Sequence, residues 1–101
     1  MDRNINVKNT IKKHKLVIFS KTYCQYSKLA KKILSLYNVK SIKIVELDKL
    51  SGYKMASVQN DLKKITKQST VPQVFLNGKY LGNCENIVNF EINGHLKNLL
   101  T

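Results

Sequence analysis

The chain has 101 residues, which is enough for one compact domain with a single hydrophobic core and too few for two. Hydrophobic residues make up 43% of it and charged residues 24%, a composition that excludes an intrinsically disordered chain. The formal net charge is +12, and Arg3 is the only arginine among the basic residues. We therefore predict one domain, residues 1–101, whose positive surface attracts small anions.

A positive charge of this size could also serve nucleic-acid binding. Selective recognition of bases and phosphates usually depends on arginine, whose planar fork binds two acceptors at once. Here the charge comes from lysines dispersed from Lys8 to Lys97. We expect no nucleic-acid partner, and treat a basic nucleic-acid binder as an alternative.

The two cysteines, Cys24 and Cys84, are too few for a disulfide-stapled secreted domain, and their spacing does not suit a metal-ligand pair. Residues 1–15 contain Asp2 and no apolar core, so they do not resemble a signal peptide. No apolar run approaches the roughly 20 residues needed to span a bilayer. We expect a cytoplasmic protein without membrane association.

The first strand is predicted over residues 16–19, an unbroken apolar run that is typical of a strand buried on both faces. After the polar loop 20–23, apolar residues at helical spacing predict a helix that stops near Asn38, so that Cys24 lies at or just before its first turn. These apolar residues are Leu29, Ala30, Ile33, Leu34 and Tyr37. Residues 42–47 predict a second strand, which completes a right-handed unit with parallel strands.

A second amphipathic helix is predicted from the spacing of Met55, Val58, Leu62 and Ile65, and a strand follows over residues 73–76. The Asn77-Gly78 pair predicts a hairpin with an antiparallel return over residues 79–81. Residues 85–100 are helical with a break at residues 93–94, where glycine suits a left-handed cap. With a helix ahead of the first strand, this order predicts an α/β fold: a four-stranded mixed sheet flanked by helices on both faces.

Cys24 is the residue with a physical reason to be reactive. The start of a helix offers unsatisfied N–H groups and a partial positive charge, which favour a thiolate, and Lys21 and Lys28 are close in sequence. Such settings lower the pKa of a cysteine from about 8.5 to roughly 3.5–7.5. A free cysteine can also be a small buried hydrophobic residue, and its position alone leaves both interpretations open.

Three ordered motifs resemble the glutaredoxin family. Residues 21–27, Lys-Thr-Tyr-Cys-Gln-Tyr-Ser, resemble its active-site segment, whose usual form is a lysine, two residues, then Cys-Pro-Tyr-Cys. Residues 70–78, Thr-Val-Pro-Gln-Val-Phe-Leu-Asn-Gly, resemble its second signature. Residues 82–86, Gly-Asn-Cys-Glu-Asn, fall where the family has Gly-Gly, a Cys or Ser, and acidic residues. The resemblance covers most of the chain from Leu16 to Leu100 and implies a thioredoxin-like fold.

The resemblance also implies a binding site for glutathione as co-substrate, beside a cis peptide bond between Val71 and Pro72. Within that site Lys21 and Gln59 would hold the glycine carboxylate of glutathione. The groove would be completed by Tyr26 along its wall, by Val71 pairing with the cysteinyl moiety, by the N–H of Cys84 at the γ-glutamyl carboxylate, and by Glu85 at the ammonium group. Each of these side chains also has an ordinary structural interpretation: Lys21 and Glu85 as solvated charges, Gln59 as helix surface, and Tyr26 as a packing aromatic.

The active-site segment departs from the family pattern at two positions. Ser27 replaces the second cysteine and cannot close an intramolecular disulfide, so the resemblance implies a monothiol route through Cys24. We assign the Ser27 hydroxyl no step, and expect Ser27→Ala to keep most of the activity. Gln25 replaces the usual proline, and some glutaredoxins without it hold an iron-sulfur cluster between two subunits. Their dedicated class carries Cys-Gly-Phe-Ser and a Trp-Pro pair, whereas this chain has Tyr26 and residues 68–69, Gln-Ser.

Two departures concern the third motif. Asn83 replaces the second glycine, and if that position needs a positive φ, asparagine is the next best residue, although its side chain could crowd the γ-glutamyl end. Cys84 is expected to be a packed residue beside the ligand; the alternative is a regulatory disulfide or mixed disulfide.

The sequence thus predicts a glutathione-dependent thiol–disulfide oxidoreductase that reduces glutathione mixed disulfides through Cys24. Its partners would be glutathione and glutathionylated proteins, and we expect a monomer without a bound metal. The alternative is a dimer that binds or transfers a glutathione-ligated [2Fe-2S] cluster, with Cys24 as the protein ligand.

Overall fold

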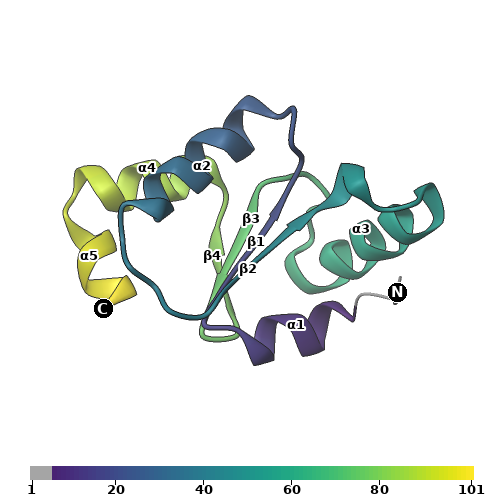
Figure 1. The fold of residues 1–101 in the computed structure, drawn as a ribbon, viewed down its shortest axis with the longest axis horizontal. Coiled ribbons are helices and arrows are strands. Elements are labelled where there is room, and N and C mark those ends of the chain that lie inside the picture. The colour runs from purple at the N-terminus through teal and green to yellow at the C-terminus, as the bar shows by residue number, and fades with distance from the viewer. Residues whose placement is uncertain (1–5) are drawn as a thin grey trace.

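The computed structural model describes residues 6–101; residues 1–5, part of the predicted domain, lie outside the described residues. The helices and strands follow the predicted order, with one short 3-10 helix, η1, added after the second strand (Figure 1). In chain order the elements are α1 (Val7–Lys13), β1 (Leu16–Ser20), α2 (Gln25–Ser35), β2 (Ile42–Glu46), η1 (Leu47–Lys49), α3 (Gly52–Thr66), β3 (Gln73–Leu76), β4 (Lys79–Gly82), α4 (Cys84–Ile92) and α5 (His95–Leu100).

A four-stranded mixed sheet forms the centre of the molecule, with strand order β2-β1-β3-β4 (Figure 1). β1 and β2 run parallel, with Ser20 opposite Glu46 where both strands end, as the predicted strand–helix–strand unit requires. β3 runs antiparallel to both β1 and β4. Asn77 and Gly78 join β3 to β4 with φ angles of 52° and 81°, both positive as a type I′ hairpin turn requires. The predicted sheet and hairpin are confirmed.

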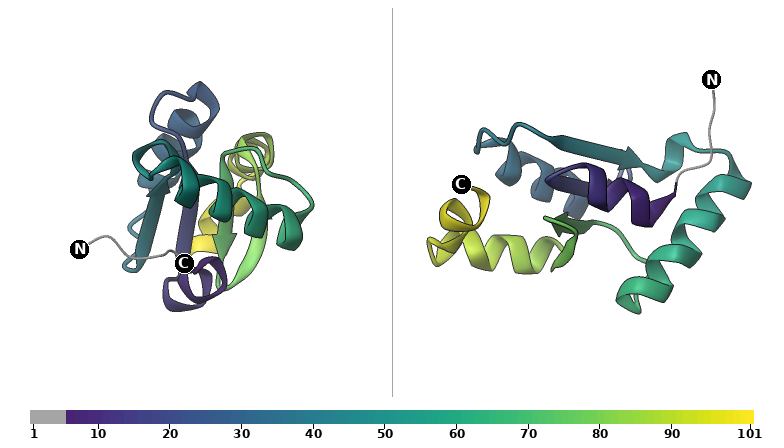
Figure 2. Two further views of the ribbon diagram at one scale, coloured as in Figure 1. Left: turned by 90° about the vertical axis from the view of Figure 1, so that its right-hand side faces the viewer. Right: turned by 90° about the horizontal axis from the view of Figure 1, so that it is seen from below.

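Helices cover both faces of this sheet (Figure 2). α1 and α3 pack on one face, whereas α2, α4 and α5 pack on the other. β1 lies between the two cores: Val17 and Phe19 belong to the first, and Leu16 and Ile18 to the second. All five residues of β1 are buried, which explains the unbroken apolar run in the sequence.

Two polar contacts fix α2, the helix that follows the first strand. Lys31 of α2 forms an ion pair with Glu46 at the end of β2, with 2.7 Å between Nζ and Oε2. The Tyr37 hydroxyl, just beyond α2, donates a hydrogen bond to the Glu91 carboxylate of α4. Because β1 feeds directly into α2, the helix begins at the edge of the sheet where β1 and β2 end.

Three local features refine the sequence prediction. α2 ends at Ser35, earlier than the predicted stop at Asn38, because the next two N–H groups bond to carbonyls three residues back, as in a tightened last turn. The helical tail breaks where predicted, with Gly94 at a φ of 77° between α4 and α5. Because β2 is an edge strand, Ile42 and Ile44 stay 40% and 43% exposed. Among residues 6–101, no helix has the length and apolar character to cross a bilayer.

Gly82, where β4 turns into α4, is a position that only glycine suits. Its φ is 140°, and a Cβ there would lie 2.5 Å from the Asn86 side chain. We expect Gly82→Ala to lower the free energy of unfolding by about 1–3 kcal/mol or more, since backbone strain and a clash add together. Gly52→Ala is the matched control, because a Cβ at Gly52 meets nothing within 4 Å, and it should be neutral or slightly stabilising. Urea denaturation of both variants would test this, and equal effects would contradict it.

Candidate active site around Cys24

Cys24 is the N-cap residue of α2 and is half-buried at the edge of the sheet. The polar loop after β1 forms a turn, in which the Cys24 N–H bonds to the Lys21 carbonyl at 3.1 Å. The Cys24 carbonyl then accepts the first helical hydrogen bond, from the Lys28 N–H at 2.9 Å. The sulfur therefore lies at the positive end of α2, as the sequence predicts.

Opposing effects act on the Cys24 sulfur. Its partial burial favours the neutral thiol and acts to raise the pKa, but the surrounding hydrogen-bond donors outweigh this effect. The Ser27 hydroxyl contributes most to the lowering, followed by the N–H groups of Ser27 and Tyr26 and by the charge of Lys21. The pKa of Cys24 is therefore lower than that of an ordinary cysteine, although the thiol makes no side-chain capping hydrogen bond. Lys28 is exposed and is not among the groups that lower it.

Ser27 is a part of the site that the sequence does not predict. Its side chain is 0% exposed, and its Oγ accepts a hydrogen bond from the Lys21 N–H at 3.4 Å. The hydroxyl therefore lies inside the loop that carries Cys24. A serine in place of a cysteine indicates only the loss of a disulfide; its hydrogen bonding depends on how the loop folds back.

A contact from η1 holds the same loop from its other side. The Thr22 N–H donates to Asp48 Oδ1 at 2.9 Å, and the Thr22 hydroxyl donates to Asp48 Oδ2. These two hydrogen bonds, led by that of the hydroxyl, lower the pKa of the Asp48 carboxyl. The two residues are 26 positions apart, and no pattern in the sequence links them.

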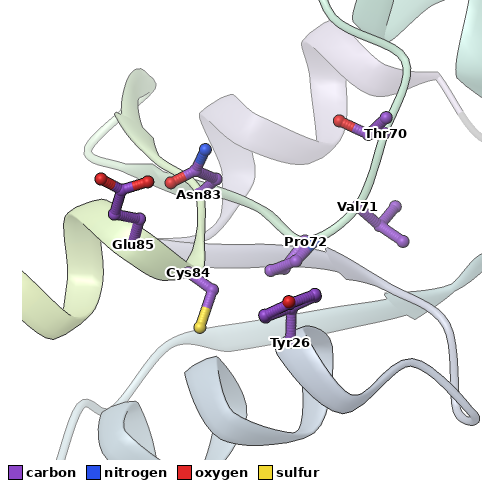
Figure 3. Close-up of a pocket in the computed structure, with 7 residues that line it drawn as sticks. All are labelled: Tyr26, Thr70, Val71, Pro72, Asn83, Cys84 and Glu85. Atoms are coloured by element: carbon purple, nitrogen blue, oxygen red, sulfur yellow. The ribbon is translucent and has the colours of Figure 1, made fainter.

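A pocket of about 280 Å³ opens between the start of α2, the loop before β3 and the start of α4 (Figure 3). Figure 3 shows Asn83 and Glu85 at one end, Thr70 and Val71 at the other, and Tyr26 beside Pro72 between them. The Val71–Pro72 peptide bond is cis, as the resemblance implies. The residues that line the pocket are Tyr26, Thr70, Val71, Pro72, Asn83, Cys84 and Glu85.

The structure brings together five of the residues predicted for the glutathione site, from three separate segments: Tyr26, Val71, Pro72, Cys84 and Glu85. It adds Thr70 and Asn83 to the same pocket. Lys21 and Gln59 are both half-buried and do not line it; Lys21 lies beside Cys24, and Gln59 is on α3. Their predicted contact with a glycine carboxylate stays a prediction.

The start of α4 has a reciprocal side-chain cap and two N–H groups that are not used within the helix. Asn83 and Asn86 cap it reciprocally, each side chain accepting from the other's N–H, at 3.0 and 3.1 Å. The N–H groups of Cys84 and Glu85, the first two of the helix, have no partner within it. Asn83 has a φ of −99°, so this position needs no positive φ, and Gly82 takes the unusual backbone instead.

Cys84 lines the pocket but differs from Cys24 in its chemistry. Burial raises the pKa of the Cys84 thiol, and the nearby Cys24 raises it further, against a smaller lowering by the backbone of Ala30. Cys24 itself does not line the pocket; Tyr26, two residues further along the same segment, does. Across residues 6–101, no three His, Cys, Asp or Glu side chains gather closely enough to hold a metal ion.

The mixed sheet with its βαβ unit and the cis-proline loop before β3 are those of a thioredoxin-like fold. The glutaredoxin family profile matches residues 16–81, and the chain belongs to the glutaredoxin family. An uncharacterized monothiol glutaredoxin of Caenorhabditis elegans is 38% identical over 99 residues, covering 98% of this chain and 66% of the relative. Glutaredoxin-C4 of Arabidopsis thaliana is 44% identical over 95 residues, covering 93% of this chain and 67% of that one.

A crystal structure of a buckwheat glutaredoxin–glutathione complex matches with a TM-score of 0.84 and 33% identity, covering 93% of this chain and 83% of that one. The chain spans between about half and two thirds of the length of the first curated relatives it matches.

The contrast between the two cysteines can be measured by alkylation. At pH 7 we expect limiting iodoacetamide to label Cys24 about ten-fold or more faster than Cys84, because one pKa unit changes the thiolate fraction ten-fold below both pKa values. Peptide mapping by mass spectrometry would give the two rates. In Cys24→Ser, Cys84 should stay slow, and preferential labelling of Cys84 in the unmodified chain would contradict the assignment.

Proposed function

We propose that this chain is a glutathione-dependent thiol–disulfide oxidoreductase that reduces glutathione mixed disulfides by a monothiol route through Cys24. The observation that carries the proposal is the low-pKa Cys24 thiol beside a pocket built by the cis-proline loop and the start of α4. A thiolate is the nucleophile of disulfide exchange, and the pocket suits a small peptide-like anion. The glutathione complex of the buckwheat relative supports the same ligand class.

The start of α4 would bind the γ-glutamyl end of glutathione. Its carboxylate would accept hydrogen bonds from the N–H groups of Cys84 and Glu85, which the Asn83 cap leaves without a helical partner. The exposed Glu85 carboxylate, at the same end of the pocket, would face the ammonium group. The partial positive charge at the start of α4 would thus pair with the γ-glutamyl carboxylate, and the negative charge of Glu85 would pair with the ammonium group.

The loop before β3 would bind the middle of glutathione. In this proposal the backbone of Val71, next to the cis bond, pairs with the cysteinyl moiety as a peptide edge. Tyr26, 69% exposed on the first turn of α2, covers the groove from the other side. The glycine carboxylate would then leave the pocket toward Lys21, with Gln59 of α3 as its second contact.

The reaction takes two exchanges. The Cys24 thiolate attacks the glutathionyl sulfur of a mixed disulfide; the new bond joins Cys24 to glutathione, and the substrate leaves as a thiolate that takes a proton from water. A second glutathione, as its thiolate, attacks the glutathionyl sulfur on Cys24 and forms glutathione disulfide. Cys24 returns as a thiolate, so each mixed disulfide consumes one reduced glutathione and yields one substrate thiol and one glutathione disulfide.

The low pKa of Cys24 assists both exchanges. It keeps the attacking sulfur ionised near neutral pH, and it makes the same sulfur a good leaving group in the second exchange. The net charge of +12 attracts the anionic glutathione to the surface. The positive charge on Lys21 lies next to the sulfur that must carry the negative charge.

The assignment of a single attacking cysteine leads to unequal effects of substitution. Cys24→Ser should abolish reduction of a small glutathione mixed disulfide, because a serine hydroxyl is not ionised at neutral pH. Cys84→Ser should keep most of the activity, since its backbone N–H and not its thiol would contact glutathione. The readout is glutathione disulfide formation, with thermal unfolding as a folding control. Full activity in Cys24→Ser would sink the proposal.

An iron-sulfur cluster remains the second candidate, because Gln25 and Ser27 flank Cys24 in the pattern of some cluster-binding glutaredoxins. Such a cluster would need Cys24 from two copies, together with glutathione. Reconstituted anaerobically with iron, sulfide and glutathione, the protein should remain a colourless monomer on size exclusion. A brown dimer whose visible absorption disappears in Cys24→Ser would favour the cluster instead.

A further inference from the structure

Three lysines at the end of α3 are not used by the proposed reaction. A hollow of about 470 Å³ opens there, and the described residues that line it are Asn60, Lys63, Lys64 and Lys67. All four are exposed, and within residues 6–101 none of the three ammonium groups pairs with a carboxylate. Asp61, on the same helix, is half-buried and does not line the hollow. Lys63, Lys64 and Lys67, here called the lysine patch, thus present unbalanced positive charge to solvent.

The backbone of Lys67 holds an unfavourable conformation. Lys67 caps α3 with a φ of 68°, in the left-handed region where glycine is the usual residue. Among residues 6–101 the only other non-glycine residue with a positive φ is Asn77, in the hairpin turn. The helix dipole favours lysines in the last turn, such as Lys63 and Lys64, but it does not require one at the strained position. Strained residues concentrate at functional sites, and this one adds a third positive charge to the hollow.

A short, hydrogen-bonded loop joins the lysine patch to the candidate glutathione pocket. Lys67 lies three residues before Thr70, which lines that pocket, so their Cα atoms are at most roughly 11 Å apart. The loop is fixed by Gln73, whose side chain is 0% exposed. Its amide donates to the carbonyls of Gln68 and Thr70 at 2.7 and 3.0 Å, and its oxygen accepts from the Thr66 hydroxyl at 2.9 Å. The patch is therefore held in a fixed position relative to the Thr70 end of the pocket shown in Figure 3.

The chemistry of the hollow selects among anionic partners. Among residues 6–101 it is lined by no arginine and no aromatic side chain. It therefore lacks both the planar fork that grips a phosphate and a ring on which a nucleic-acid base could stack. Three separate ammonium groups instead suit several point charges, which the carboxylates of aspartate and glutamate provide. These features favour an acidic protein segment over a nucleic acid.

We propose that the lysine patch docks an acidic segment of a glutathionylated protein, so that the chain prefers substrates with aspartate or glutamate residues near the modified cysteine. This inference rests on the proposed function and names the substrate class for the same site. The patch takes no part in the two exchanges. It attracts acidic substrates and lowers their KM, whereas kcat is set at Cys24 and stays the same.

The test compares two glutathionylated peptides that differ only in their flanking residues, glutamate in one and glutamine in the other. For the unmodified protein at low salt, kcat/KM should be about ten-fold higher for the glutamate peptide. Physiological salt should reduce this preference. The combined variant Lys63→Gln, Lys64→Gln, Lys67→Gln should lose the preference through a higher KM for the glutamate peptide alone. The glutamine peptide and a small glutathione mixed disulfide should be reduced as before.

Lys40, Lys79 and Lys97 supply the matched control. All three are exposed, like the lysine patch, so replacing them with glutamine removes the same charge. Lys40 and Lys79 flank the end of the sheet where β1 begins, opposite the end that leads to Cys24, and Lys97 is on α5. This control variant should keep the preference for the glutamate peptide. An equal loss of preference in both combined variants would assign the effect to net charge and overturn the docking site.

Direct binding separates this inference from the proposed function. The same two peptides, without glutathione and with serine in place of cysteine, would be titrated with the protein and followed by fluorescence anisotropy. If the glutamate peptide binds through the three lysines but the unmodified protein reduces no mixed disulfide, the docking site stands and the proposed function fails. If both glutathionylated peptides are reduced equally well, the function stands and the docking site is wrong. A short single-stranded DNA that binds through these lysines, where the glutamate peptide does not, would also overturn the docking site.

Discussion

The stabilisation of a negative charge on one half-buried sulfur is the interaction on which this site depends. Burial acts to raise the pKa of Cys24, and the surrounding groups outweigh it and lower the pKa: the Ser27 hydroxyl, two N–H groups at the start of α2, and Lys21. Their positions follow from the fold. β1 is buried on both faces, and the Lys31–Glu46 ion pair joins α2 to β2.

A second constraint is that three distant segments must meet to form one pocket. The sheet order places β3 beside β1, which brings the cis-proline loop next to the start of α2. The β3–β4 hairpin then returns the chain to the same edge, where Gly82 and the Asn83 cap start α4. The pocket has the start of α4 at one end and the cis-proline loop at the other, which is the arrangement that the proposed glutathione site uses, and Tyr26 connects it to the segment that carries Cys24.

The parts that depend on short-range patterns were predictable from the sequence. The buried strand, the hairpin at Asn77 and the break at Gly94 each have a local signature, whereas the cis bond came only from the resemblance. Contacts between distant segments have no local signature in the sequence. Thr22 and Asp48, for example, are 26 positions apart, and the three-residue η1 that carries Asp48 is too short for a periodic pattern. The sequence left open whether Asn83 needs a positive φ; in the structure the neighbouring Gly82 has the positive φ and Asn83 does not. The burial of Ser27 and its hydrogen bond from the Lys21 N–H depend on how the loop folds back, which residue type alone does not indicate.

The central claim is that Cys24 takes the glutathionyl group and that a second glutathione removes it. The most direct test incubates the protein with a small glutathione mixed disulfide in the absence of free glutathione, followed by intact-mass analysis and peptide mapping. We predict one glutathione per chain, bound to Cys24, and its quantitative release as glutathione disulfide when glutathione is added. Glutathione found on Cys84, or the substrate's own thiol bound to Cys24 in its place, would contradict the mechanism.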